Sequence, residues 1–217
     1  MTKTDSALKA DVTNELIWDP SIKETAVGVA VKDGVVTLTG HLDTYAEKDA
    51  AIRAVRRIDG VKAIAVEIDV RLSPSHQRSD TDIARSVELA LKWNASIPPD
   101  SVRVVVDHGW VTLQGEVDWN FQRGAAESVT RILKGVVGIS NELKLKPKAL
   151  AADVSQKIEE ALKRQALRDA QHIQVVVAGD VVKLTGTVHS WQERRAAEGV
   201  AWSARGVRSV VNDLQVV

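Results

Sequence analysis

Residues 33–40 read DGVVTLTG, and the phrase returns as HGWVTLQG at residues 108–115 and as GDVVKLTG at residues 179–186. Each copy sets two turn-forming residues before an apolar run that ends in glycine. Because a β-rich run precedes each phrase, the pattern predicts a tight two-residue hairpin three times. Gly34 and Gly109 supply the positive φ that such a turn requires.

The repetition extends well beyond the hairpin. A shift of 75 (from 5 to 80) places residues 5–70 on residues 80–145 without a gap, and a shift of 71 (from 80 to 151) leads on to residues 151–216. The intervening residues 71–79 and 146–150 contain proline and polar residues, as linkers do. We therefore expect three tandem repeats joined by two short linkers.

Each repeat also carries the periods of two helices. Leu8, Val12 and Leu16 form an apolar stripe at helical spacing, and the other copies repeat it. A second helix follows the hairpin, and in two copies it opens with a capping box: Thr44 with Glu47, and Ser190 with Glu193. Copy two has Trp119 at the cap position, so its helix start must be satisfied otherwise. With a final strand such as residues 141–145, each repeat is αββαβ, an α+β unit of two helices on a three-stranded sheet.

Residues identical in all three copies are apolar side chains and glycines, and none of them is chemically reactive. We assign structural roles at turns and helix ends to eight glycines: Gly34, Gly40, Gly60, Gly109, Gly115, Gly135, Gly186 and Gly206. Of these, Gly60 and its equivalents are expected to end the second helix.

Composition argues against catalysis. The chain of 217 residues has a formal net charge of zero and no cysteine. The lack of cysteine excludes disulfides, iron–sulfur clusters and thiolate zinc sites. No metal-binding, nucleotide-binding or nucleophile motif is present, so we expect no enzyme activity, no cofactor and no metal. We expect solvated turn or edge positions for the histidines: His41, His76, His108, His172 and His189.

One string invites a nucleic-acid interpretation. Gly135-Val-Val-Gly138 matches the GXXG loop that clamps a nucleic-acid backbone in KH domains. It occurs only in copy two, where every copy turns towards its final strand, and no basic stripe covers the repeat. We therefore do not expect nucleic acid as a partner.

The repeated motifs resemble the BON domain. In copy two the motifs comprise six segments: Ala90-Leu91, residues 104–106, residues 109–115, Ala125-Ala126, Gly135-Val136 and residues 141–145. Copy one departs at Val66, where the other copies have asparagine, and copy three reverses its turn to Gly179-Asp180. The resemblance implies a mixed sheet and a non-enzymatic binding module of bacterial envelope and osmotic-stress proteins, often proposed to touch phospholipid.

The second helix of copy three carries the candidate binding residues. Trp191 and Trp202 are eleven positions apart, close to three helical turns, and Arg195 and Arg205 flank them on a face away from the core stripe. Tryptophan with arginine suits an anionic lipid interface or a protein hot spot. Equally, these rings could pack against a neighbouring copy and close the array.

The other tryptophans receive structural assignments. Trp18 and Trp93 occupy equivalent places near the end of the first helix, and we expect them at the edge of the core. Trp110 has the outward parity of its hairpin strand.

Our leading hypothesis is a stress-related adaptor that docks on anionic phospholipid or a membrane-associated protein. The alternatives are a protein–protein scaffold that self-associates without lipid binding, and a sensor of a small ion or ligand, which no ligand cluster supports. The sequence shows no signal peptide and no membrane-spanning run. We expect a cytoplasmic protein, peripheral to the membrane when bound, or a periplasmic one if a leader has been removed.

Overall fold

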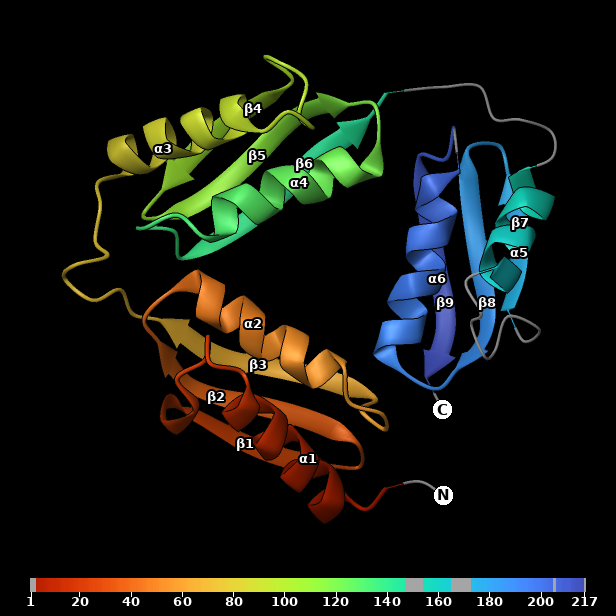
Figure 1. The fold of residues 1–217 in the computed structure, drawn as a ribbon, viewed down its shortest axis with the longest axis horizontal. Helices are drawn as coiled ribbons and strands as arrows, with labels where there is room; N and C mark the ends of the chain where they lie inside the picture. Colours follow the sequence, from red (N-terminus) through yellow and green to blue (C-terminus); the bar gives the residue numbers. More distant parts are fainter. Residues whose placement is uncertain (1–2, 147–153, 165–172, 205, 217) are drawn as a thin grey trace.

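The computed structural model describes residues 3–146, 154–164, 173–204 and 206–216. In these residues the chain forms three αββαβ units, each with two helices on one three-stranded sheet (Figure 1). The α+β architecture expected from the repeats is therefore confirmed.

The three units have matching elements. Unit 1 comprises α1 (Asp5–Trp18), the 3-10 turn η1 (Glu24–Ala26), β1 (Val27–Lys32), β2 (Val35–Leu42), α2 (Tyr45–Arg56) and β3 (Ala63–Val70). Unit 2 comprises α3 (Asp80–Trp93), β4 (Val102–Asp107), β5 (Trp110–Val117), α4 (Asn120–Arg131) and β6 (Gly138–Leu145). Unit 3 comprises α5 (Val154–Arg164), β7 (Ile173–Ala178), β8 (Val181–Val188), α6 (Trp191–Ser203) and β9 (Ser209–Val216).

Every sheet is mixed, as the resemblance implied. The second strand of each unit lies in the centre, antiparallel to the first strand and parallel to the third. A parallel neighbour requires a crossover connection, and α2, α4 and α6 provide it. The second helix of each unit is thus tied to both the central strand and the last strand.

In units 1 and 2, a carboxylate at the start of the first helix binds the hairpin turn, a contact that was not predicted from the sequence. Asp33 and Gly34 connect β1 to β2 with φ values of 53° and 80°, the left-handed pair of a type I′ turn. The side chain of Asp5, at the start of α1, accepts hydrogen bonds from the N–H groups of Asp33 at 2.7 Å and Gly34 at 3.0 Å. Asp80 accepts the same two bonds in unit 2, both at 2.9 Å.

In unit 3 the glycine of the hairpin turn comes first rather than second, and this unit also lacks the carboxylate. The position equivalent to Asp5 and Asp80 carries alanine in the sequence, residue 151. Here the glycine comes first, with Gly179 at a φ of 59°, and no other described residue of this turn has positive φ. A type II′ turn of this kind needs only its first central residue in the left-handed region.

The repeated glycine of the second strand has a steric reason. A Cβ on Gly115 would lie 2.1 Å from the carbonyl oxygen of Ser101, and Gly115 has a φ of 133°. Gly40 is equally close to the carbonyl oxygen of Ala26. Only glycine lets the hairpin backbones approach this closely. The phrase that defines the repeat is therefore a backbone requirement.

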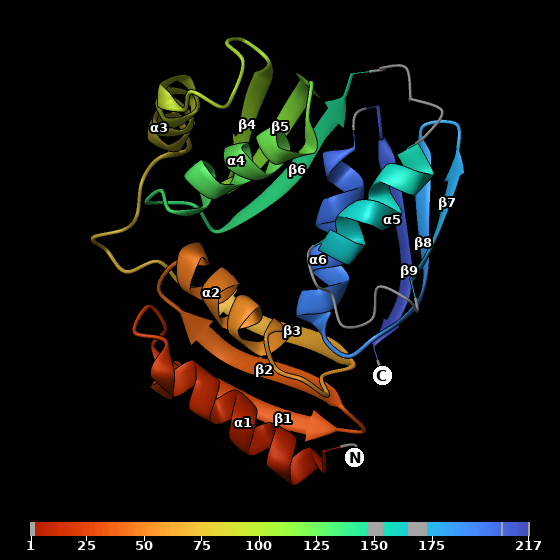
Figure 2. The same cartoon turned by 45° about the vertical axis from the view of Figure 1, so that its right-hand side comes forward.

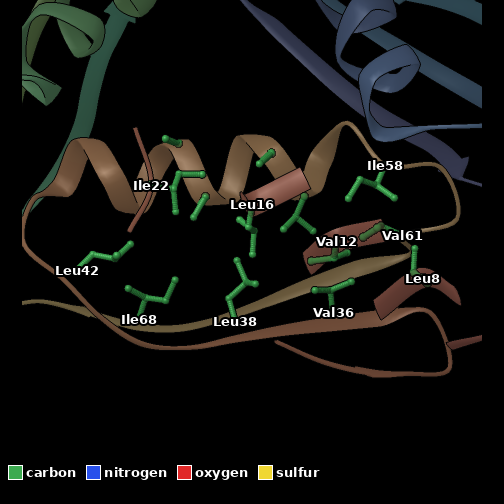
Figure 3. Packing of buried hydrophobic residues seen from close by; sticks show 14 residues of the cluster. Leu8, Val12, Leu16, Ile22, Val36, Leu38, Leu42, Ile58, Val61 and Ile68 are labelled. Atoms are coloured by element: carbon green, nitrogen blue, oxygen red, sulfur yellow. The ribbon is translucent and has the colours of Figure 1, made fainter. Parts of the chain in front are cut away.

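Each unit has its own hydrophobic core between helices and sheet. In unit 1, Figure 3 shows side chains such as Leu16, Leu38 and Ile68 filling the space between α2 and the strands. These side chains are at most 2% exposed. Burying each one stabilises the fold by about 1.5–3 kcal/mol relative to leaving it exposed.

The second helices start as expected in two units, while unit 2 uses a different residue. Thr44 and Glu47 form a full capping box, and Ser190 accepts a bond from the N–H of Glu193. At the start of α4, the buried Gln122 accepts hydrogen bonds from the N–H of Asp118 at 2.9 Å and of Trp119 at 3.0 Å. Gln122 therefore provides the interaction at the helix start that a capping box provides in the other two units.

Two boundaries differ from the sequence prediction. The helices α2, α4 and α6 end three or four residues before Gly60, Gly135 and Gly206, which instead turn the chain towards the last strand. The last strand of unit 2 begins at Gly138, three residues earlier than expected. All eight glycines assigned to turns have φ values between 78° and 133°.

The units are arranged around a common centre. Figures 1 and 2 show α2, α4 and α6 turned towards one another, while α1 and α3 lie on the outside. The second helix of each unit therefore has a face that is free of its own core and directed at the other units.

Candidate functional site

The face of α6 predicted to bind lipid or a partner lies against the other units. Trp191 is half-buried and packs on the hydrophobic core of unit 1. The guanidinium of Arg194 lies 5.1 Å from the centre of its ring. The indole N–H of Trp191 is buried and has no hydrogen-bond partner among the residues that the structure describes.

Trp202 lies at a different contact. Its ring packs on the core of unit 3, and the guanidinium of Arg123 from α4 lies 5.9 Å from the ring centre. Trp191 therefore contacts unit 1 and Trp202 contacts unit 2. This arrangement corresponds to the second hypothesis above, in which the two rings pack against neighbouring copies. Arg205 lies outside the described residues, and the lipid or partner role of this face stays a prediction.

Units 1 and 2 meet through polar and aromatic residues. Arg131 of α4 forms an ion pair with Asp49 of α2, and both side chains are less than 20% exposed. Tyr45, the first residue of α2, packs on the core of unit 2. Burial of Tyr45 raises the pKa of its phenol, helped by the charges of Glu127 and Asp49.

A pocket of about 270 Å³ lies between unit 1 and unit 3, where α2 ends and α6 begins. It is lined by Arg53, Arg56, Arg57, Gln192 and Arg195. Hereafter it is called the arginine pocket. Of these lining residues, only Arg195 was among the candidates predicted from the sequence, and the structure brings it together with three arginines of α2 and its C-cap.

The four arginines differ in how they are neutralised. Arg57 lies 2.7 Å from Glu15 and 3.8 Å from Asp19, and Arg53 lies 2.7 Å from Asp49. In the described part of the chain, no carboxylate lies within 4 Å of the guanidinium of either of the other two. These two are Arg56 and Arg195.

The electrostatics of Arg56 reflect this crowding. Its half-burial lowers the pKa of the guanidinium, and the positive charge of Arg195 lowers it further. The charges of Asp49 and Glu127 act in the opposite direction. The pocket thus holds two cations, the half-buried Arg56 and the exposed Arg195, that have no direct counter-ion in the described part of the chain.

A departure from the repeat could have revealed these arginines. Unit 1 has arginine at 53, 56 and 57, where unit 2 has serine, arginine and isoleucine, and unit 3 has glycine, tryptophan and serine. Only the position of Arg56 keeps an arginine in unit 2, and unit 3 has none of the three. Because α6 forms without them, the αββαβ fold does not need these arginines, and their gathering in unit 1 indicates a separate role.

The expectation for Trp18 and Trp93 is wrong. They are 83% and 81% exposed, the most exposed of the large hydrophobic residues that the structure describes. Trp18 stands two positions after Leu16, the last residue of the core stripe, and two positions turn the helix by about 200°. Both indoles therefore point away from the cores.

Trp110 faces outward as expected, and it accounts for the GXXG string. Its ring lies over Gly138 on the neighbouring strand, where an added Cβ would meet ring carbons at 2.3 Å. Its indole N–H donates to Ser140 at 2.9 Å. Units 1 and 3 pair valine with alanine and with serine at these positions. Gly138 therefore has a steric role, because it makes room for the ring of Trp110.

Histidines and acids do not gather into a metal site among the residues described. His108 occupies the unit 2 turn, and its hydrogen bond to Asp107 raises the pKa of the imidazole. His76 contacts Ser73 within the first linker, and His172 lies outside the described residues.

Unit 1 lacks one bond between its second helix and last strand because of its departure from the BON motif at Val66. Asn141 and Asn212 donate from the last strand to a carbonyl of the second helix, at 2.9 Å and 3.3 Å, and valine cannot donate such a bond. A second link remains: Lys48 of α2 donates to a carbonyl of β3 at 2.6 Å, and its equivalent in unit 3, Arg194, makes the same bond at 3.0 Å. The helix and last strand are therefore tied in all three units.

Comparison with known proteins agrees with this architecture. The chain is similar to osmotically-inducible protein Y of Escherichia coli (strain K12), with 30% identity over 146 residues, 65% of this chain and 73% of that protein. Two structures of CdsD, a structural protein of the type III secretion system of Chlamydia trachomatis, align with 96% and 99% of this chain and 91% and 100% of theirs. Their TM-scores of 0.24 and 0.26, at 13% and 14% identity, are too low to carry an argument. The BON domain model matches residues 4–71, 79–147 and 151–217, and the chain therefore belongs to the BON domain family.

Proposed function

We propose that the chain is a non-enzymatic binding protein of a stress response that docks on anionic phospholipid membranes. The observation that carries the proposal is the exposure of Trp18 and Trp93 at matching helix ends of units 1 and 2. The link to stress rests on the similarity to an osmotically inducible protein.

Exposed apolar side chains also occur in the last turns of both helices. Leu89, one helical turn before Trp93 and on the same helix face, is 57% exposed, and Ile17, the residue before Trp18, is 56% exposed. Leaving such side chains in water forfeits hydrophobic free energy, whereas tryptophan is favoured at the boundary between headgroups and acyl chains. The two helix ends therefore suit shallow insertion into a lipid surface.

A basic side chain stands at one of these ends. Lys92, in the last turn of α3, directly precedes Trp93. A cation next to an inserting indole favours anionic headgroups over neutral ones. No described helix is both long and apolar enough to cross a bilayer, so we propose attachment at the surface.

Flotation with phospholipid vesicles tests the proposal. The full chain is expected to float with vesicles rich in phosphatidylglycerol and not with neutral phosphatidylcholine, and to be released at high salt because exposed charges are screened. Trp18→Ala and Trp93→Ala are expected to weaken flotation singly and to abolish it together, since linked weak contacts reinforce one another.

Trp110→Val is the matched control, because units 1 and 3 carry valine at this position. Its flotation should equal that of the unmodified chain. Unchanged flotation of the double variant would contradict the assignment of the two helix ends.

A protein partner is the second candidate, and the outer faces of the sheets favour it. Val105, Trp110 and Val176 are 52%, 49% and 55% exposed on these faces. No flotation under any condition would favour this alternative, and cross-linking of the purified chain would then show whether the partner is a second copy.

A further inference from the structure

The arginine pocket has the composition of an anion site. Its lining consists of four guanidinium groups and one amide, with no carboxylate among them. Arginine presents a planar fork of N–H donors that matches the oxygens of phosphate. At about 270 Å³ the pocket is below the roughly 300 Å³ at which sites for drug-sized ligands begin, so its ligand is small.

Two of the four cations lack an internal counter-ion. Arg56 is half-buried, Arg195 stands opposite it from another unit, and neither has an ion-pair partner in the described residues. Bringing like charges together costs free energy, and the neighbouring carboxylates are already engaged: Asp49 pairs with both Arg53 and Arg131, and Glu15 pairs with Arg57. A bound anion would remove this repulsion.

The pocket also borders the first turn of α6, because Gln192 is the second residue of that helix of 13 residues. The helix dipole favours negative charge at this end. Ser190 and the carboxylate of Glu193 already cap this turn, so the attraction for a bound anion comes from the arginines.

We propose that the arginine pocket binds a tetrahedral oxyanion of the phosphate class, with Arg56 and Arg195 as its main ligands, and that the bound anion joins unit 1 to unit 3. This site differs from the exposed tryptophans and does not require a membrane. Its ligand is either a free phosphate compound or the phosphate of a lipid headgroup.

Calorimetric titration of the full chain with inorganic phosphate and with glycerol 1-phosphate tests the proposal. We expect saturable binding to a single site, and a rise of the thermal unfolding midpoint beyond that given by sodium chloride at equal ionic strength, because the anion binds only the folded chain. Arg56→Gln and Arg195→Gln are each expected to weaken binding by roughly tenfold or more.

Arg85→Gln is the matched control. It removes the same charge from the exposed surface of α3, a helix that contributes no residue to the pocket. Its affinity for phosphate should be unchanged. If neither phosphate compound binds, or if Arg85→Gln weakens binding as much as the pocket variants do, the proposal is overturned. Circular dichroism shows whether each variant is folded, and Arg56→Lys, which keeps the charge, should retain part of the affinity.

A competition experiment separates the two sources of phosphate and the two proposals. If the lipid headgroup occupies the pocket, glycerol 1-phosphate should release the chain from phosphatidylglycerol vesicles, and Arg56→Gln should not float. If the ligand is a free anion, neither added glycerol 1-phosphate nor the Arg56→Gln substitution should change flotation. Phosphate binding by the Trp18→Ala/Trp93→Ala double variant should be intact in either case, so a failure of membrane docking leaves the pocket testable.

Discussion

At the scale of single residues, substitutions at matched positions form pairs that make physical sense. Trp110 lies over Gly138, whereas the other units oppose valine to a residue that has a Cβ. Asn141 ties helix to strand in unit 2, Lys48 does so in unit 1, and unit 3 has both kinds of link. The ring of Trp110 is thus matched by the glycine beneath it, and the tie between second helix and last strand is kept with different donors.

The pH response of His108 can be predicted at this scale. Because Asp107 raises the pKa of His108 above 6.5, protonated His108 stabilises the turn, and this contribution is complete below pH 6.5 and lost as pH rises through the raised pKa. Asp107→Asn should lower the pKa of His108 towards 6.5, measured by NMR titration of the imidazole. The effect of Asp107→Asn on the unfolding midpoint should shrink as pH rises. An unchanged His108 titration in the variant would contradict the assignment.

At the scale of elements, a carboxylate at the start of a first helix fixes the hairpin 28 residues later. The hairpin is predictable from its glycine and its alternating residues, and so are the apolar stripe and two of the helix starts. The carboxylate contact is not predictable from one copy, because it joins segments distant in the chain. Comparison of copies offers the clue, since alanine at 151 occurs together with the reversed turn.

Asp80→Ala tests this element-level link. The substitution leaves the N–H groups of His108 and Gly109 without their acceptor, and it should lower the free energy of unfolding by about 1–3 kcal/mol. Chemical denaturation followed by circular dichroism measures the loss. Glu88→Gln, an exposed change on the same helix, should alter stability by less than about 0.5 kcal/mol. Equal losses for the two variants would rule out a special role for Asp80.

At the scale of the whole molecule, the arrangement of the units depends on residues that the copies do not share. Trp191, Arg131 and Tyr45 each contact a neighbouring unit. The fold of one repeat follows from periodicity, which a sequence displays directly. The packing of repeats depends on which exposed faces meet, and several arrangements satisfy the same apolar pattern. For this reason the sequence left two roles open for Trp191, and it missed the arginine pocket.

The contact between units 1 and 2 can be measured with a double-mutant cycle on Asp49 and Arg131. Both side chains are mostly buried, so each single variant, Asp49→Asn or Arg131→Gln, leaves a charge without its partner across the contact. We expect a coupling free energy of about 1–2 kcal/mol from denaturation of the four proteins. A coupling below about 0.3 kcal/mol would mean that the ion pair does not hold the units together.

The contacts made by the inward helices have a consequence for how such a chain can have grown. If it arose by duplication of an ancestral segment, the hairpin glycines had to persist in every descendant, whereas the outer face of each second helix was free to diverge. That divergence has made the copies non-interchangeable. A chain with its segments shuffled would keep three folded modules and lose the assembly, because Asp49 would no longer meet Arg131 and Trp191 would no longer meet the core of unit 1.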